Sequence, residues 1–154
     1  MKQTTSTNKA FTLIEILVVV LIIGILAAIA VPQYQKSVAK SAAQELVIQG
    51  RALMTAQSEY FLANGSFAKD LSALSLTFPN NSWECFPNYC QNGSLKYSYG
   101  VTFEVTNNFT GDTTTHLTCI AYHERAMALC ESIGGKYSFY NDTYSTHYYT
   151  IYEK

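Results

Sequence analysis

Hydrophobic residues form one uninterrupted stretch near the start of the chain. From Phe11 to Val31 the only polar side chains are those of Thr12 and Glu15. At a rise of about 1.5 Å per residue, ~20 apolar residues in a helix cross a hydrocarbon core ~30 Å thick. The pattern therefore predicts a membrane-spanning helix over residues 11–31, and this helix contains one carboxylate.

The pattern changes at Pro32 from wholly apolar to amphipathic. Charged side chains supply a solvated face, and apolar residues recur at helical spacing at Val38, Ala42, Leu46, Leu53 and Tyr60. Asn64-Gly65 is a suitable helix stop. We expect residues 11–63 to form a helix of ~80 Å, whose amphipathic part, residues 32–63, packs on the rest of the protein.

Gly24 and Pro32 bracket a weak stretch of this helix. Proline lacks the amide hydrogen and clashes with the carbonyl group four residues earlier, at Ala28, and glycine disfavours helix. Two outcomes remain open from the residues: the helix unwinds between Gly24 and Pro32 in a packed assembly, or it only bends.

Residues 64–154 have the pattern of a β-rich globular head. Residues 95–105 and 113–122 read as strands, residues 124–135 as a short helix closed by Gly134-Gly135, and residues 136–140 and 145–152 as a hairpin. The expected fold class is α+β, with a long N-terminal helix packed on an antiparallel sheet.

Composition narrows the function classes. The net charge is −1, and the only basic residues between positions 70 and 153 are Lys96, Arg125 and Lys136. Because nucleic-acid binding relies on clustered basic side chains, we expect no direct binding of nucleic acid.

Four cysteines, all after residue 80, indicate disulfides in an oxidising compartment. The favoured pairing is local, with Cys85–Cys90 closing the loop CFPNYC and Cys119–Cys130 tying a strand to the next helix. A crossed pairing and free buried thiols are the alternatives.

The candidate chemistries outside the disulfides are weak. His116, Cys119 and His123 resemble a metal cluster, but positions 116 and 119 point to opposite faces of a strand. Asp112, Asn141 and Asp142 lack the dense carboxylate spacing of a calcium site. No catalytic triad, phosphate loop or carboxylate pair stands out, so we expect no enzyme, no metal and no cofactor.

The segment KAFTLIEILVVVLIIGILAAIAVPQY, residues 9–34, resembles the class III signal and N-terminal helix of type IV pilins and pseudopilins. The resemblance covers roughly residues 9–67. It implies that residues 1–10 are a leader, cut by a prepilin peptidase between Ala10 and Phe11, and that Phe11 is then N-methylated. Ala10 departs from the glycine that the family usually has before the cut.

The resemblance also gives Glu15 a role in assembly. Residues four apart share a helix face, so the new Phe11 amine and Glu15 lie on the same side. The amine could neutralise Glu15 within one chain, or it could reach Glu15 of a neighbouring chain. A third possibility is that Glu15 is only tolerated at the membrane surface.

The leading hypothesis is a structural subunit of a type IV pilus. The precursor would sit in the bacterial inner membrane with its basic N-terminus in the cytoplasm. The pilus assembly machinery would then build many copies into an extracellular helical filament, a homo-oligomer. The alternatives are a pseudopilin of a type II secretion system and a monomeric membrane-anchored binding or adhesion protein.

Overall fold

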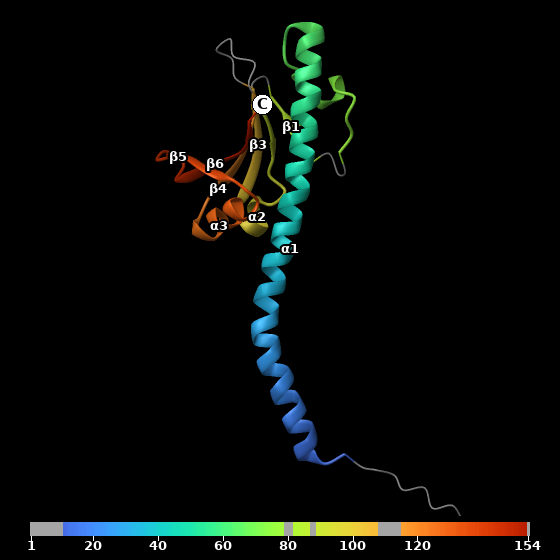
Figure 1. Ribbon diagram of the computed structural model, residues 1–154, viewed down its shortest axis with the longest axis vertical. Helices are drawn as coiled ribbons and strands as arrows, with labels where there is room; N and C mark the ends of the chain where they lie inside the picture. The colour runs from blue at the N-terminus through green and yellow to red at the C-terminus, as the bar shows by residue number, and fades with distance from the viewer. Residues whose placement is uncertain (1–10, 79–81, 87–88, 108–114, 154) are drawn as a thin grey trace, which may run out of the picture. The chain divides into compact units, whose positions relative to one another are not determined.

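The computed structural model describes residues 11–78, 82–86, 89–107 and 115–153 (Figure 1). The chain divides into two compact units, residues 1–37 and residues 38–154. Helix α1, Leu13–Asn64, contributes to both units. Asn64 is its last residue, and Gly65 follows with a φ of 70°, so the predicted helix stop is confirmed.

The second unit contains a six-stranded antiparallel sheet in the order β1-β2-β3-β4-β6-β5. Its strands are β1 (Glu84–Cys85), β2 (Tyr89–Asn92), β3 (Val101–Asn107), β4 (Thr115–Ala121), β5 (Lys136–Asn141) and β6 (Thr146–Glu153). Within the described residues it also contains three short helices: η1 (Leu71–Ala73), α2 (Lys96–Tyr99) and α3 (Glu124–Ser132). The expected α+β architecture, with a helix packed on an antiparallel sheet, is confirmed.

The core of this unit lies between one face of the sheet and the Val38–Asn64 part of α1. Alternate residues of β3, namely Val101, Phe103 and Val105, are each 0% exposed, because side chains on a strand alternate between the two faces. Leu117 and Cys119 of β4 are equally buried. Figure 1 shows the later part of α1 running alongside the sheet.

The buried face of α1 differs from the predicted stripe. Leu46 and Leu53 are buried as expected, but Val38 is 40% exposed, and Ala42 and Tyr60 are only partly buried. The complete set of buried helix residues is Ala39, Ala43, Leu46, Val47, Gly50, Leu53, Met54 and Gln57. Gly50 belongs to this face because the sheet approaches closely there: a Cβ on Gly50 would lie 2.6 Å from Leu117 Cδ1.

The predicted strand over residues 95–105 is partly wrong. Lys96–Tyr99 forms the short helix α2, and the strand begins only at Val101. Gly100 separates the two elements, with a left-handed φ of 69° and its N–H bonded to the carbonyl oxygen of Lys96. A left-handed residue ends a helical turn, and glycine adopts this conformation without steric cost.

The other predicted elements are present with small changes. The C-terminal hairpin forms as an antiparallel β5–β6 pair, and α3 ends before the two glycines. Gly135 donates from its N–H to the carbonyl oxygen of Cys130, so it belongs to the cap and not to the helix. Strand β4 begins at Thr115, and residues 113–114 of the predicted strand lie outside the described residues.

Gly100→Ala should destabilise the head by about 1–3 kcal/mol, because the new Cβ would occupy a left-handed residue and overlap the ring of His123. That ring caps α3 by accepting from the N–H of Ala126. The control is Gly93→Ala, where a Cβ meets nothing within 4 Å. Thermal unfolding of both variants tests the prediction, and equal melting temperatures would contradict it.

Candidate assembly segment

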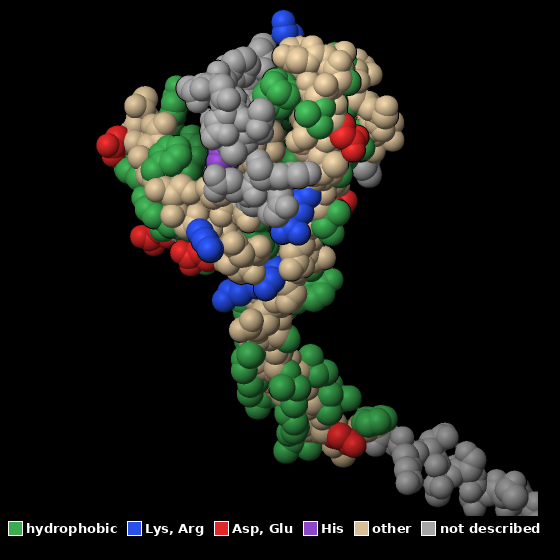
Figure 2. Space-filling model, turned by 45° about the horizontal axis from the view of Figure 1, so that its top comes forward, with side chains coloured by type: hydrophobic (Ala, Val, Ile, Leu, Met, Phe, Trp, Pro, Cys, Tyr) green, Lys and Arg blue, Asp and Glu red, His purple; other side chains and the backbone are tan. Residues whose placement is uncertain are grey.

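The part of α1 that belongs to the first unit, residues 13–37, has an apolar surface that no other described part of the chain covers up to Val31. Every side chain from Phe11 to Val31 is exposed, including Leu13 at 79% and Ile29 at 66%. A window of this helix has a mean hydropathy of 3.2 with none of it buried, so by length and composition it can cross a membrane. The core helix of a soluble protein would be covered, and Figure 2 shows hydrophobic side chains over this helix surface instead.

Thr12 forms the N-terminal cap of α1. The N–H of Glu15 donates to the Thr12 carbonyl oxygen at 3.1 Å and to Thr12 Oγ1 at 3.3 Å. The acid in the first turn faces the positive end of the helix dipole, which favours a carboxylate at this position. This cap was not among the predicted features, although Thr12-x-x-Glu15 has the Thr/Ser-x-x-Glu spacing of a capping box.

Phe11 and Thr12 precede the first turn, since α1 begins at Leu13. The shared helix face of the Phe11 amine and Glu15 is therefore not formed in the uncut chain. For the amine and Glu15 to share a face, the helix would have to extend to Phe11 after the leader is removed. This arrangement stays a prediction for the cut protein. Ala10, the other residue of the predicted cleavage site, lies outside the described residues.

Gly24 and Pro32 both lie inside a continuous helix in this single chain. A Cβ on Gly24 would meet nothing within 4 Å, so the glycine is not required by a close neighbour here. Unwinding between the two residues was expected for a packed assembly, where neighbouring helices shield the freed carbonyl groups, and it stays a prediction.

Both local disulfides are present in the head. Cys85 and Cys90 are directly opposite each other in the β1–β2 ladder, and Cys119–Cys130 joins β4 to α3. Each bridge therefore links neighbouring elements of the chain. The sequence predicted the first pair only as a closed loop and did not identify β1 and β2 as strands.

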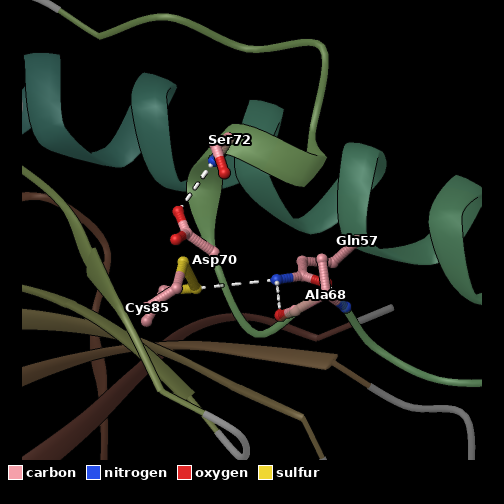
Figure 3. The surroundings of a disulfide bond; sticks show 6 residues. Gln57, Ala68, Asp70, Ser72 and Cys85 are labelled. Carbon is pink, nitrogen blue, oxygen red and sulfur yellow. Dashed lines mark hydrogen bonds between the residues drawn. A yellow bond between two sulfur atoms is a disulfide. The ribbon is translucent and has the colours of Figure 1, made fainter.

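Gln57 connects α1 to the segment that follows it and to the first disulfide (Figure 3). Its Nε2 donates to the carbonyl oxygen of Ala68 at 3.1 Å, and its Oε1 accepts from the N–H of Ala68 at 2.9 Å. The same Nε2 lies 3.6 Å from Cys90 Sγ. A second link runs from Trp83 Nε1 to Gln49 Oε1 at 2.9 Å, so two glutamines of α1 bond to residues that follow the helix, one at Ala68 and one at Trp83.

Three of the residues considered for metal binding have other partners. Cys119 is in a disulfide, His123 caps α3, and Asn141 Oδ1 accepts from the N–H of Thr143. Across residues 11–78, 82–86, 89–107 and 115–153, no group of three or more His, Cys, Asp or Glu side chains could hold a metal ion. Asp112 lies outside these ranges.

Two ionisable groups of the sheet have shifted pKa values. Burial raises the pKa of Glu104, and a hydrogen bond with Thr106 partly opposes that rise. Burial also raises the pKa of Tyr149, and the nearby Glu131 adds to the effect. Both groups lie on strands of the head, and neither is part of the apolar helix of residues 11–31.

The first unit thus defines a class of protein: one with an exposed apolar helix near its N-terminus that is long enough to cross a membrane, has a capped start and contains one carboxylate. Residues 5–31 match the family model described as the prokaryotic N-terminal methylation motif. The chain is 42% identical over 63 residues to the type IV major pilin protein PilE of Neisseria gonorrhoeae, covering 41% of this chain and 38% of the relative.

Two further relatives carry similar names. The type IV major fimbrial protein FimA of Dichelobacter nodosus is 48% identical over 65 residues, covering 42% of this chain and 41% of the relative. The type IV major pilin protein PilA of Myxococcus xanthus is 52% identical over 54 residues, with 35% and 24% covered. The chain spans less than half the length of these relatives, and no solved structure matches it. The motif and the relatives together show that the chain is similar to type IV major pilins over less than half of its length.

Proposed function

We propose that this protein is a structural subunit of a type IV pilus that polymerises through its N-terminal helix. The bare apolar helix of residues 11–31 carries the proposal, because such a surface needs either lipid or other helices around it. The methylation motif coincides with this helix, and the relatives named above are major pilins. The head, held on α1 by its core, would then cover the filament surface.

The proposed pathway has two states of the same helix. In the precursor, residues 11–31 span the inner membrane with the basic leader in the cytoplasm, so that the cysteine-containing head folds in an oxidising compartment. A prepilin peptidase then removes residues 1–10 and methylates Phe11. The pilus assembly machinery transfers the helix from lipid into a filament of many copies, where neighbouring helices replace lipid.

Mass spectrometry of filaments sheared from the cell surface tests this proposal. We expect this chain to be abundant in the filaments and to begin at N-methylated Phe11. A chain that is processed but confined to the envelope next to a secretion apparatus would indicate a pseudopilin instead. An uncut chain with no filament would indicate a monomeric membrane-anchored binding or adhesion protein.

The cleavage site gives a sharper prediction. Ala10→Gly should be cut at least as fast as the wild type, because the peptidase requires a small residue there and glycine is smaller still. Ala10→Leu is the matched variant, and its bulk should leave mostly uncut precursor. Pulse labelling followed by electrophoresis of the two forms measures both rates, and normal cutting of Ala10→Leu would place the cleavage site elsewhere.

A further inference from the structure

The two disulfides differ in how deeply their cysteines are buried. Cys90, Cys119 and Cys130 are each 0% exposed, whereas Cys85 is partly exposed at the edge strand β1. Thiol–disulfide exchange begins when a thiolate attacks one sulfur of the bridge, so access to that sulfur limits the rate. Of the four cysteines, only Cys85 is partly exposed, so it is the one most open to an external thiolate.

The sulfur that would leave in this attack already has a hydrogen-bond donor. Gln57 Nε2 lies 3.6 Å from Cys90 Sγ, and the Gln57 side chain is 0% exposed. Its two hydrogen bonds with Ala68, at 3.1 and 2.9 Å, fix the orientation of the amide, so the N–H directed at the sulfur does not depend on a mobile side chain (Figure 3). A donor held in place stabilises negative charge that develops on its acceptor.

We propose that the Cys85–Cys90 bridge is a thiol–disulfide exchange site with a fixed direction of attack. An external thiolate forms a new S–S bond with Cys85 Sγ, and the bond between Cys85 and Cys90 breaks. Its electron pair stays on Cys90 Sγ as a thiolate, which accepts the hydrogen bond from Gln57. Attack of this thiolate on Cys85 Sγ restores the bridge and releases the external thiolate, with no net oxidation.

The partner class is therefore an external thiol that approaches the β1 edge of the sheet. Gln57 acts as a positioning residue, because it touches the leaving sulfur and not the incoming one. The proposed exchange site involves only α1 and the head, and it does not depend on whether the protein forms filaments.

The direction of attack can be tested on the unaltered protein. The full chain in detergent micelles is treated with reduced glutathione, free thiols are alkylated at intervals, and the peptides are mapped. We expect Cys85–Cys90 to open before Cys119–Cys130, with glutathione on Cys85 and the alkyl group on Cys90. Glutathione on Cys90, or earlier opening of Cys119–Cys130, would overturn the proposal.

The role of Gln57 needs a matched pair of variants. Gln57→Glu keeps the length of the side chain and its acceptor for Ala68, but it removes the donor to Cys90 Sγ. Gln49→Glu makes the same change on the same helix and keeps the acceptor for Trp83 Nε1. We expect opening of Cys85–Cys90 to be about tenfold slower in Gln57→Glu and unchanged in Gln49→Glu.

The second bridge is the internal control for folding, since loss of the head structure would speed the opening of Cys119–Cys130. If that happens in Gln57→Glu, Gln57→Met replaces it, because methionine has a similar length and brings no charge into the core. It should also slow opening of the first bridge. An unchanged rate in a folded Gln57 variant would remove Gln57 from the mechanism.

Discussion

Filament yield should fall sharply when Glu15 is replaced by Gln, while the precursor still inserts into the membrane and is still cut. A neutral amide costs less in lipid than a carboxylate does, so insertion is not impaired. In the proposed filament, however, the Phe11 amine of each incoming subunit would lose its counter-ion. Removing one partner of a buried ion pair typically costs ~3–5 kcal/mol, and ~1.4 kcal/mol already corresponds to a tenfold change in equilibrium.

Glu59→Gln is the matched control, because it makes the same change on the exposed face of α1 within the head. Filaments sheared from cells that express each variant are quantified against the membrane-bound subunit. Co-expression with the wild type adds a second measurement, in which Glu15→Gln subunits should enter filaments only alongside wild-type ones. Filaments built at normal yield from Glu15→Gln alone would leave Glu15 as a tolerated charge at the membrane surface.

Removing the Cys119–Cys130 bridge should cost the head about 3 kcal/mol of unfolding free energy, and removing Cys85–Cys90 about 2 kcal/mol. The two bridges span sequence separations of 11 and 5, and a longer closed loop restricts the unfolded chain more. Cys119–Cys130 also fastens α3 to a central strand, and both of its cysteines are 0% exposed. Its loss therefore also disturbs core packing.

Double alanine variants of each pair avoid leaving a free thiol. Denaturant unfolding of the full chain in detergent can be followed by the fluorescence of Trp83, the single tryptophan, which is 2% exposed in the core. Near-ultraviolet circular dichroism gives an independent probe of the same transition. A larger loss of stability from the Cys85/Cys90 pair would show that the β1–β2 edge matters more to the head than α3 does.

The sequence by itself determined the features that depend on residues close together along the chain. The apolar run of residues 11–31 predicted a helix that could span a membrane, because the cost of polar groups in lipid depends on composition over ~20 residues, and this run lies exposed in the structure. Asn64-Gly65 predicted the end of α1, and the two strand-like segments on either side of Asn141-Asp142 predicted the β5–β6 hairpin. The short spacings within the cysteine pairs favoured the two local bridges that the structure contains.

Only the tertiary structure decided which face of α1 is buried and which short segments join the sheet. Neither Gly50 nor Gln57 is a large apolar residue, yet both are buried on α1. Leu117 lies close to Gly50, and Ala68 and Cys90 form hydrogen bonds with the Gln57 side chain. Similarly, Lys96–Tyr99 became a helix because Gly100 turns the chain before β3, and Glu84–Cys85 became a strand because Tyr89–Asn92 pairs with it. Whether a small or polar residue is buried depends on the residues that pack against it. The partners of Gly50 and Gln57 lie 11 to 67 residues away in the chain, so the hydrophobic periodicity of α1 does not reveal them.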